Sequence, residues 1–243
     1  MKKSTLLLFT LFAFGFAISQ EKTKVRVIMM KVKPDMISEF EKGVAAHMAK
    51  YHPQATDPVS IYRVMSGSRT GEYHYVQGGL DWAGIEGKSY PADHQEDWSK
   101  NAGKFVTSSE IHYLNHNSNY SYNETSGPIE YEIVSFITVR QGQYGTYLEM
   151  MQTRKDALTK AKDGRNISVY NHSFSGTTEF NFVAVSSLPG GLKDMDKPQT
   201  PLAKILNEQV GDHAQQDYQK KSEAAVEKIE TFLVRRMANL SSK

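Results

Sequence analysis

The chain has 243 residues, of which 39% are hydrophobic and 23% charged, and it contains no cysteine. This composition excludes the disordered, collagen-like and disulfide-stapled classes of protein. Without cysteine the chain can have no thiolate nucleophile and no cysteine-ligated metal cluster.

The first 19 residues have the pattern of a secretory signal peptide. Lys2 and Lys3 precede an apolar run, and the small residues Ala17 and Ser19 stand at the positions that a signal peptidase requires. The apolar run is shorter than the roughly 20 residues that span a bilayer. We therefore expect this segment to be removed, giving a mature chain that starts at Gln20, is periplasmic or secreted, and has no membrane insertion.

The net charge gives no support to nucleic acid as a partner. The chain has 29 basic and 27 acidic side chains, and loss of Lys2 and Lys3 with the signal peptide leaves 27 of each. A balanced chain has no general electrostatic attraction to phosphate backbones or anionic lipids. We expect no nucleic-acid partner.

The first half of the mature chain, residues 24–122, has the pattern of one βαββαβ unit. Strands are indicated by short β-branched and apolar runs, and the first helix by apolar residues at helical spacing. Gly67 and Gly71 permit the tight turn of a hairpin. We expect a strand, a helix, a hairpin, a second helix and a last strand at 25–32, 37–51, 59–65 with 72–77, 93–106 and 111–115.

The second half, residues 128–240, repeats this pattern. The tripeptide at 60–62 matches 168–170 at an offset of 108 residues, and the hairpin strand at 72–76 matches 179–183 at an offset of 107 residues. Such a repeat at a nearly constant spacing indicates an internal duplication. The duplication predicts strands at 133–139 and 231–237, and one long second helix at 201–229. Residues 123–127 lie in a segment rich in Asn and Ser, which is typical of a linker between two units.

This element order predicts an α+β fold of two tandem ferredoxin-like units. The first strand of each unit is apolar on both faces, so we expect the two sheets to pack face to face as a pseudo-dimeric α/β barrel. With this order and duplication the chain resembles the dimeric α/β-barrel superfamily, which includes antibiotic-biosynthesis-monooxygenase-like and haem-degrading families. The resemblance implies a ligand cavity between or beside the sheets.

The histidine spacing does not predict a metal site. His112 and His116 are the nearest pair, but on a strand they lie about 13 Å apart, too far to share an ion. No helical metal-binding motif is present. We expect no bound metal.

Both second helices open with an Asp-His pair, Asp93-His94 and Asp212-His213. One interpretation makes His94 or His213 a general base oriented by a nearby carboxylate. The alternative is that aspartates favour the positive end of a helix and that the histidine only marks its boundary. The sequence favours the alternative.

Alternation along the hairpins suggests a second set of site residues. It assigns Tyr62, Val64, Tyr73 and Tyr75 to one face of the first hairpin. The polar residues Arg63, Glu72 and His74 are assigned to the other face. If the aromatic face packs on the helices, the polar face lines the space between the sheets, and Trp82 caps its mouth. The ligand-binding candidates are therefore Arg63, Glu72, His74, Trp82, Asn171 and Asn181. A self-satisfied polar layer or an exposed sheet edge is the alternative interpretation.

Three functions remain open at this point. The first is an exported small-molecule-binding or accessory protein with no catalytic signature. The second, implied by the resemblance, is a cofactor-independent monooxygenase or isomerase whose candidate catalytic residues are His74, Arg63, Glu72 and His94. The third is haem binding, with His74, His112 or His116 as axial ligand, and otherwise no cofactor is expected. Homo-oligomer formation is compatible with all three.

Overall fold

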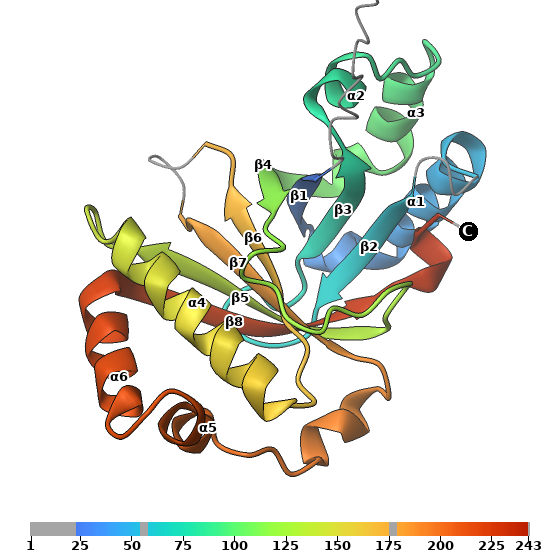
Figure 1. Ribbon diagram of the computed structural model, residues 1–243. Helices are drawn as coiled ribbons and strands as arrows, with labels where there is room; N and C mark the ends of the chain where they lie inside the picture. Colours follow the sequence, from blue (N-terminus) through green and yellow to red (C-terminus); the bar gives the residue numbers. More distant parts are fainter. Residues whose placement is uncertain (1–22, 54–57, 175–178, 243) are drawn as a thin grey trace, which may run out of the picture.

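The computed structural model describes residues 23–53, 58–174 and 179–242, and the predicted signal peptide lies outside these residues. Within them, the strands close into one barrel in the order β1-β3-β2-β8-β5-β7-β6-β4 (Figure 1). The α+β class and the pseudo-dimeric α/β barrel predicted from the sequence are confirmed. Among the helices of the described residues, none combines the length and the hydropathy that a membrane span requires.

The first unit follows the predicted order, with one added short helix, α2, after the hairpin. Strand β4 starts earlier than predicted, because it pairs with β1 along nearly its whole length. The elements are β1 Lys24–Val32, α1 Ile37–Tyr51, β2 Val59–Val64, β3 Tyr73–Leu80, α2 Trp82–Glu86, α3 His94–Asn101 and β4 Val106–His116, with 3₁₀ turns at Pro34–Met36 and Gly103–Phe105.

The second unit has the same strand order, but its predicted long helix is wrong. Gly211 (φ +143°) and His213 (φ +73°) break it into two helices, and Val226 already belongs to the last strand, where it pairs with Val139. The elements are β5 Tyr131–Val139, α4 Tyr144–Ala161, β6 Ser168–His172, β7 Phe182–Leu188, α5 Leu202–Gln209, α6 Ala214–Ala225 and β8 Val226–Arg236, with 3₁₀ turns at Leu192–Asp196 and Ala238–Leu240.

The two sheets join at both of their edges. Strand β2 pairs with β8, where Val64 lies opposite Val234, and β4 pairs with β6, where Leu114 lies opposite His172. Edge strands with unpaired backbone groups are a liability that closure removes. The sheets that the sequence predicted to face each other are therefore the two halves of one closed barrel.

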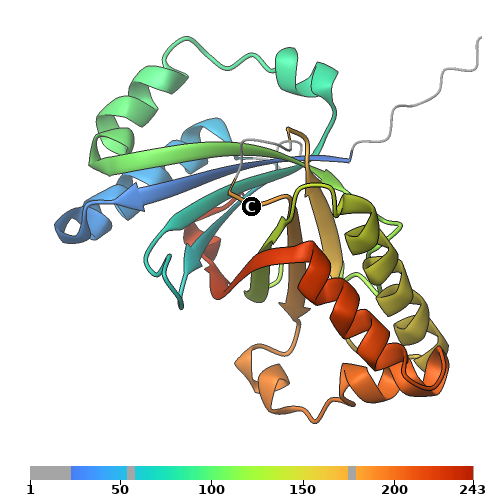
Figure 2. The same ribbon diagram turned by 90° about the vertical axis from the view of Figure 1, so that its left-hand side faces the viewer.

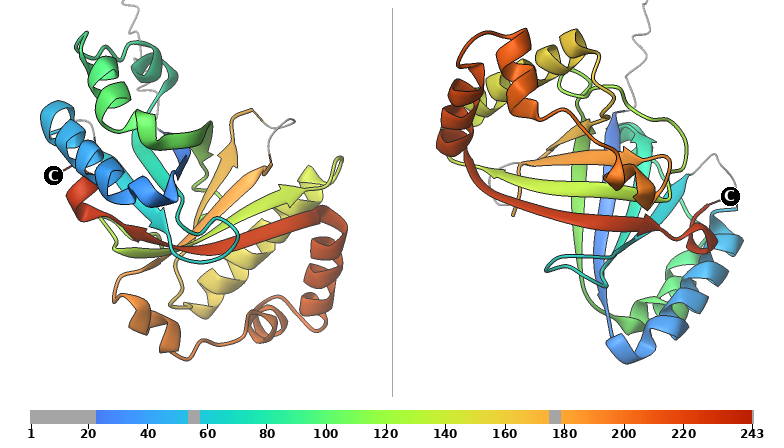
Figure 3. Two further views of the ribbon diagram at one scale, coloured as in Figure 1. Left: turned by 180° about the vertical axis from the view of Figure 1, so that it is seen from behind. Right: turned by 90° about the horizontal axis from the view of Figure 1, so that it is seen from below.

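The helices cover the barrel from outside. Helices α1 and α3 lie on the first unit and α4, α5 and α6 on the second, on opposite sides of the strands (Figures 2 and 3). Phe40 and Val44 of α1 pack on Tyr73 of β3, and Met151 of α4 belongs to a matching cluster with Phe182. A third cluster, which includes Phe136 and Phe232, fills part of the barrel interior.

Candidate active site inside the barrel

Inward-facing side chains enclose a cavity of about 260 Å³ at one end of the barrel. Most of its lining is apolar and comes from valine, leucine, isoleucine and phenylalanine side chains. The polar groups that reach it include Tyr62, Glu132, Tyr170 and Ser187. A mostly apolar cavity with a few converging polar groups is the usual form of a small-molecule site.

Glu132 is the acidic residue in this lining. It faces inward because β5 alternates, which also places Val134 and Phe136 inside. The Tyr62 hydroxyl hydrogen-bonds to its carboxylate, and Ser187 Oγ donates to Glu132 Oε1 over 3.5 Å. Burial raises the pKa of Glu132 to about 7, because these two hydrogen bonds offset only part of the cost of desolvating the charge.

The two tyrosines of the cavity keep their protons at neutral pH. Burial, and then the nearby Glu132 carboxylate, raise the pKa of Tyr62 well above its usual value. The same two causes raise the pKa of Tyr170 to about 12. The Tyr170 hydroxyl can therefore act as a hydrogen-bond donor toward a bound molecule, whereas the Tyr62 hydroxyl can do so only when it no longer donates to the Glu132 carboxylate.

The connection between the two units forms part of the cavity wall. Thr125 and Gly127, from the segment predicted as a linker, and Ile129 contribute to its lining. His116 lies beside this segment and is hydrogen-bonded to Glu124 over 2.7 Å. The linker is thus part of the site.

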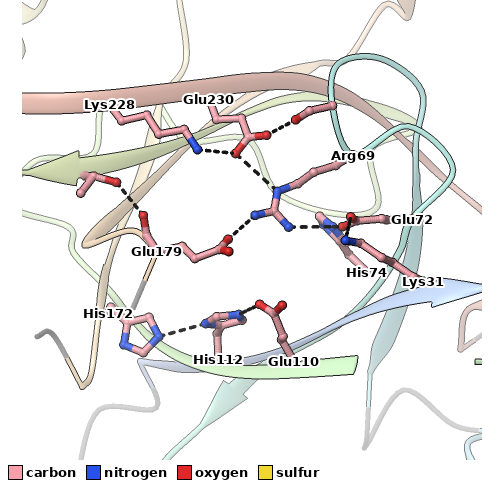
Figure 4. Close-up of polar contacts among 12 residues, drawn as sticks. Lys31, Arg69, Glu72, His74, Glu110, His112, His172, Glu179, Lys228 and Glu230 are labelled. Carbon is pink, nitrogen blue, oxygen red and sulfur yellow. Dashed lines mark hydrogen bonds and ion pairs between the residues drawn. The ribbon is translucent and has the colours of Figure 1, made fainter. Parts of the chain in front are cut away.

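The opposite end of the barrel is closed by a network of charged residues around Arg69 (Figure 4). Its guanidinium lies 3.4 Å from Glu72 and 3.5 Å from Glu230, and it also contacts Glu179. Beneath it the Phe136 and Phe180 rings stack 4.2 Å apart. Side chains therefore fill this end of the barrel.

His74 lies between the cavity and this network. It is 4% exposed, its ring packs 5.7 Å from that of Phe232, and its Nε2 lies 3.7 Å from Glu72. Burial lowers the pKa of His74 despite the attraction of Glu72, so the imidazole is neutral at pH 7. Burial alone raises the pKa of Glu72, but His74 and Arg69 together hold it below its usual value.

Another pair of histidines lies at the same end. Phe174 N donates to His172 Nδ1 over 3.0 Å, and His172 Nε2 lies 3.2 Å from His112 Nδ1. His172 Nε2 therefore carries the proton and donates to His112, whose own Nε2 lies 3.5 Å from Glu110 (Figure 4). Burial lowers the pKa of both histidines, and both rings are held in one tautomer.

Of the predicted ligand-binding residues, the structure places Glu72 and His74 inside the barrel and Arg63 outside. Alternation predicted Tyr62 on the aromatic face, but the register pairs Tyr62 with His74, and Arg63 with Tyr73. Arg63 therefore faces α1, where it lies 3.9 Å from Glu41. The predicted cluster of Arg63, Glu72 and His74 is wrong in its first member.

Asn171, Asn181 and Trp82 do not reach the cavity either. Asn171 Oδ1 accepts a hydrogen bond from Asn117 over 3.3 Å, and Asn181 Oδ1 accepts from the Val139 amide over 2.6 Å. Trp82 packs outside the barrel, 5.5 Å from the Tyr113 ring. Asn171 lies in β6 next to the inward-facing Tyr170, so alternation turns it away from the interior. Trp82 begins helix α2, and Asn181 precedes β7.

His94 lies outside the barrel as well, between α1 and α3, together with His47 and His52. A role for His94 as a base in the barrel cavity is therefore excluded by position. The prediction of no metal site rested on the spacing of histidines along the sequence. These three histidines meet only through the packing of helices.

Glu132, Tyr170 and Ser187 were not among the site residues predicted from the sequence. A signal was present for Glu132, since it is the acid in the otherwise uncharged run Tyr131–Val139. An acid at an inward position of such a strand is costly to bury without a function or a partner.

No family model and no curated protein matches the chain. Solved structures do match over nearly its whole length. A candidate monooxygenase from Lactobacillus acidophilus NCFM has 10% identity and a TM-score of 0.54, covering 91% of this chain and 96% of its own. An anthrone oxidase-like protein has 11% identity and a TM-score of 0.56, with coverages of 90% and 92%.

A chlorite dismutase from Candidatus Nitrospira defluvii, in complex with imidazole, has 13% identity and a TM-score of 0.55, covering 91% of this chain and 93% of its own. These neighbours bear the names of enzymes, which contradicts the first expectation, a binding or accessory protein with no catalytic signature. Together with the order of the strands, they show that the chain has the fold of the dimeric α/β-barrel superfamily.

Proposed function

We propose that this protein is a cofactor-independent monooxygenase that removes a proton from a small aromatic substrate held inside the barrel. The observation that carries the proposal is Glu132, a carboxylate with a pKa of about 7 in an otherwise apolar cavity. A general base works best when its pKa lies near the working pH.

The neighbouring groups suit the charge that develops during proton removal. Glu132 takes the proton from an acidic carbon of the substrate, and negative charge moves to the substrate's oxygen. The Tyr170 hydroxyl donates to that oxygen, and the Tyr62 hydroxyl can do so as well once Glu132 holds the proton and no longer accepts from it. The apolar walls exclude water, which strengthens these hydrogen bonds. The anion then reacts with O₂: a CH₂ group becomes C=O, and the second oxygen atom leaves as water.

Size and fold agree with this reaction. A volume of about 260 Å³ lies just below the range of drug-sized sites, so the substrate is small. An anthrone oxidase-like protein and candidate monooxygenases share the fold. The reaction requires no organic cofactor, and that absence stays a prediction.

Haem does not fit the residues first considered for it. The His74 ring is enclosed by Phe136 and Phe232. His112 is held by His172, and His116 is bonded to Glu124 beside the linker. His74 borders the barrel cavity with its ring enclosed, and His112 and His116 are not among the residues that line the cavity. No step is therefore assigned to haem in the barrel.

Location and assembly rest on the sequence alone. A signal peptide at residues 1–19 supports action in the periplasm or outside the cell. Homo-oligomer formation also stays a prediction.

Oxygen consumption with anthrone as probe tests the proposal. We expect the untagged chain to convert anthrone to anthraquinone with one O₂ consumed per turnover. Glu132→Gln should lower kcat at least 100-fold, because the amide cannot take the proton. Tyr62→Phe should lower it about tenfold, because one donor is lost.

Glu130→Gln is the matched control. Glu130 lies two residues away, is 55% exposed and pairs with Arg235 outside the cavity, so its replacement should leave turnover unchanged. Full activity in Glu132→Gln, or equal losses in both variants, would contradict the role of Glu132. If anthrone and other small phenols and ketones of similar size are all inert, the monooxygenase proposal is wrong.

A further inference from the structure

Outside the barrel, His47, His52 and His94 form a cluster whose ligand nitrogens all lie within 4.8 Å of one another. The cluster lies where α1 packs beside α3 (Figure 1). His47 comes from the body of α1, His52 follows its last residue, and His94 is the first residue of α3. We propose that these three imidazoles bind one divalent transition-metal ion of the zinc class. This proposal does not depend on the proposed function.

The distances are close to those of a tetrahedral site. Metal–nitrogen bonds of about 2.0–2.1 Å place two ligand nitrogens of a tetrahedral zinc ion roughly 3.3 Å apart. His52 Nε2 and His94 Nε2 are 3.3 Å apart. The third nitrogen lies at most 4.8 Å from these two, so a shift of at most about 1.5 Å completes the site.

Asp97 orients His47 in the way that a carboxylate orients a metal-bound histidine. Its Oδ2 lies 2.9 Å from His47 Nδ1, and the His47 ring is 3% exposed. This contact places the proton on Nδ1 and leaves Nε2 as the ligand atom. Such carboxylate–histidine pairs accompany most histidine-ligated metals, and their loss typically lowers affinity 10- to 100-fold.

The surroundings hold the rings in place and leave one side open. Tyr90 stacks on His94 at 4.1 Å, and Trp98 packs edge-on to His47 at 5.3 Å. The cluster borders a pocket of about 780 Å³ that is also lined by Arg26 and Ser99. Three protein ligands and an open fourth position are typical of sites where the metal binds water or a small anion.

The donor set selects the class of metal. Neutral imidazoles suit zinc, copper, nickel, cobalt and iron, whereas calcium and magnesium require oxygen ligands. The second unit lacks this set, since α4, α5 and α6 contain no histidine. His213 follows Asp212 directly before α6, just as His94 follows Asp93 at the start of α3. The His213 side chain is exposed, so this residue supplies a matched control.

Titration of the untagged, chelator-treated chain with Co²⁺ and Zn²⁺ tests the proposal. We expect one Co²⁺ per chain, with the intense visible bands of tetrahedral coordination, displacement of Co²⁺ by Zn²⁺, and a higher Tm in the presence of Zn²⁺. His94→Ala should lower affinity at least 100-fold, and Asp97→Asn 10- to 100-fold. His213→Ala and Glu132→Gln should bind as the parent does.

His94 is only half-buried, so its variant is expected to fold, and far-ultraviolet circular dichroism checks this. No stoichiometric Co²⁺ binding, or equal affinity in His94→Ala and the parent, would overturn the proposal. A parallel titration with haemin covers the alternative occupant. A haem complex that depends on His94 and prevents Co²⁺ binding would also overturn it. Loss of turnover in Glu132→Gln with intact Co²⁺ binding separates this site from the barrel cavity.

Discussion

The ionised form of Glu132 is expected to support catalysis and to lower the stability of the fold. Its pKa is about 7 in the folded chain against an ordinary 4.5, so folding favours the protonated form. The stability that this proton supplies is complete below pH 4.5 and is lost as pH rises through about 7. The ionised carboxylate that abstracts protons is therefore the form whose burial destabilises the fold.

Glu132→Gln should consequently be inactive and more stable than the parent at pH 8. We expect a gain in the free energy of unfolding of up to about 3 kcal/mol at pH 8 and little change at pH 5. Urea denaturation at both pH values measures it. A variant that is destabilised equally at pH 5 and pH 8 would mean that Glu132 holds a structural hydrogen bond and carries no burial penalty.

At the scale of single elements, the β2–β3 turn does more than reverse the chain. It carries Arg69 over the end of the barrel, where the side chain is 12% exposed and lies beside Glu72, which is 7% exposed. Removing one member of a buried ionic network leaves its partners uncompensated, which typically costs 3–5 kcal/mol.

We therefore expect Arg69→Met to lower the free energy of unfolding by about 3 kcal/mol, as measured by urea denaturation at pH 7. Arg235→Met is the control, because Arg235 and Glu130 are about half-exposed and such pairs contribute less than about 1 kcal/mol. If Arg69→Met loses no more than Arg235→Met, the network does not stabilise this end of the barrel.

The hairpin also illustrates why the candidate site was only partly predictable. Alternation correctly placed Glu72 and His74 on one face, because period 2 is a property of any strand. Which residue of β2 lies opposite His74 depends on the turn, and the bond from Val64 N to Glu72 O sets that register. A register error of one residue moves a side chain to the other face of the sheet. For this reason the prediction placed Arg63 on the face of His74, where the structure has Tyr62.

For the whole molecule, closure of the barrel makes the two units depend on each other. Both units contribute to the cavity wall, with Tyr62 and His74 from the first and Glu132 and Tyr170 from the second. Separated, each would expose two strand edges and the apolar interior face of its sheet.

We expect residues 20–127 and 128–243, produced as separate chains, to form a 1:1 complex when mixed. Each alone should self-associate or precipitate. Size-exclusion chromatography with light scattering measures the masses. A half that stays monomeric and unfolds cooperatively would contradict the idea that closure supplies much of the stability.

The sequence by itself excluded the disordered, collagen-like and disulfide-stapled classes, through its composition. It also determined the βαββαβ order in both halves and the barrel class, because these follow from local periodicity and from repetition along the chain. The predicted boundaries 24–122, 123–127 and 128–240 and the internal duplication stay predictions, although the two halves have the same strand order.

Only the tertiary structure decided which polar residues meet. Glu132 and Tyr62 come from different units and become neighbours through the pairing of both with β8. His47 and His94 are 47 residues apart and meet through the packing of α1 on α3. Contacts between distant segments depend on strand register and helix placement. These are set by the summed packing of the whole chain and leave no pattern at short spacing.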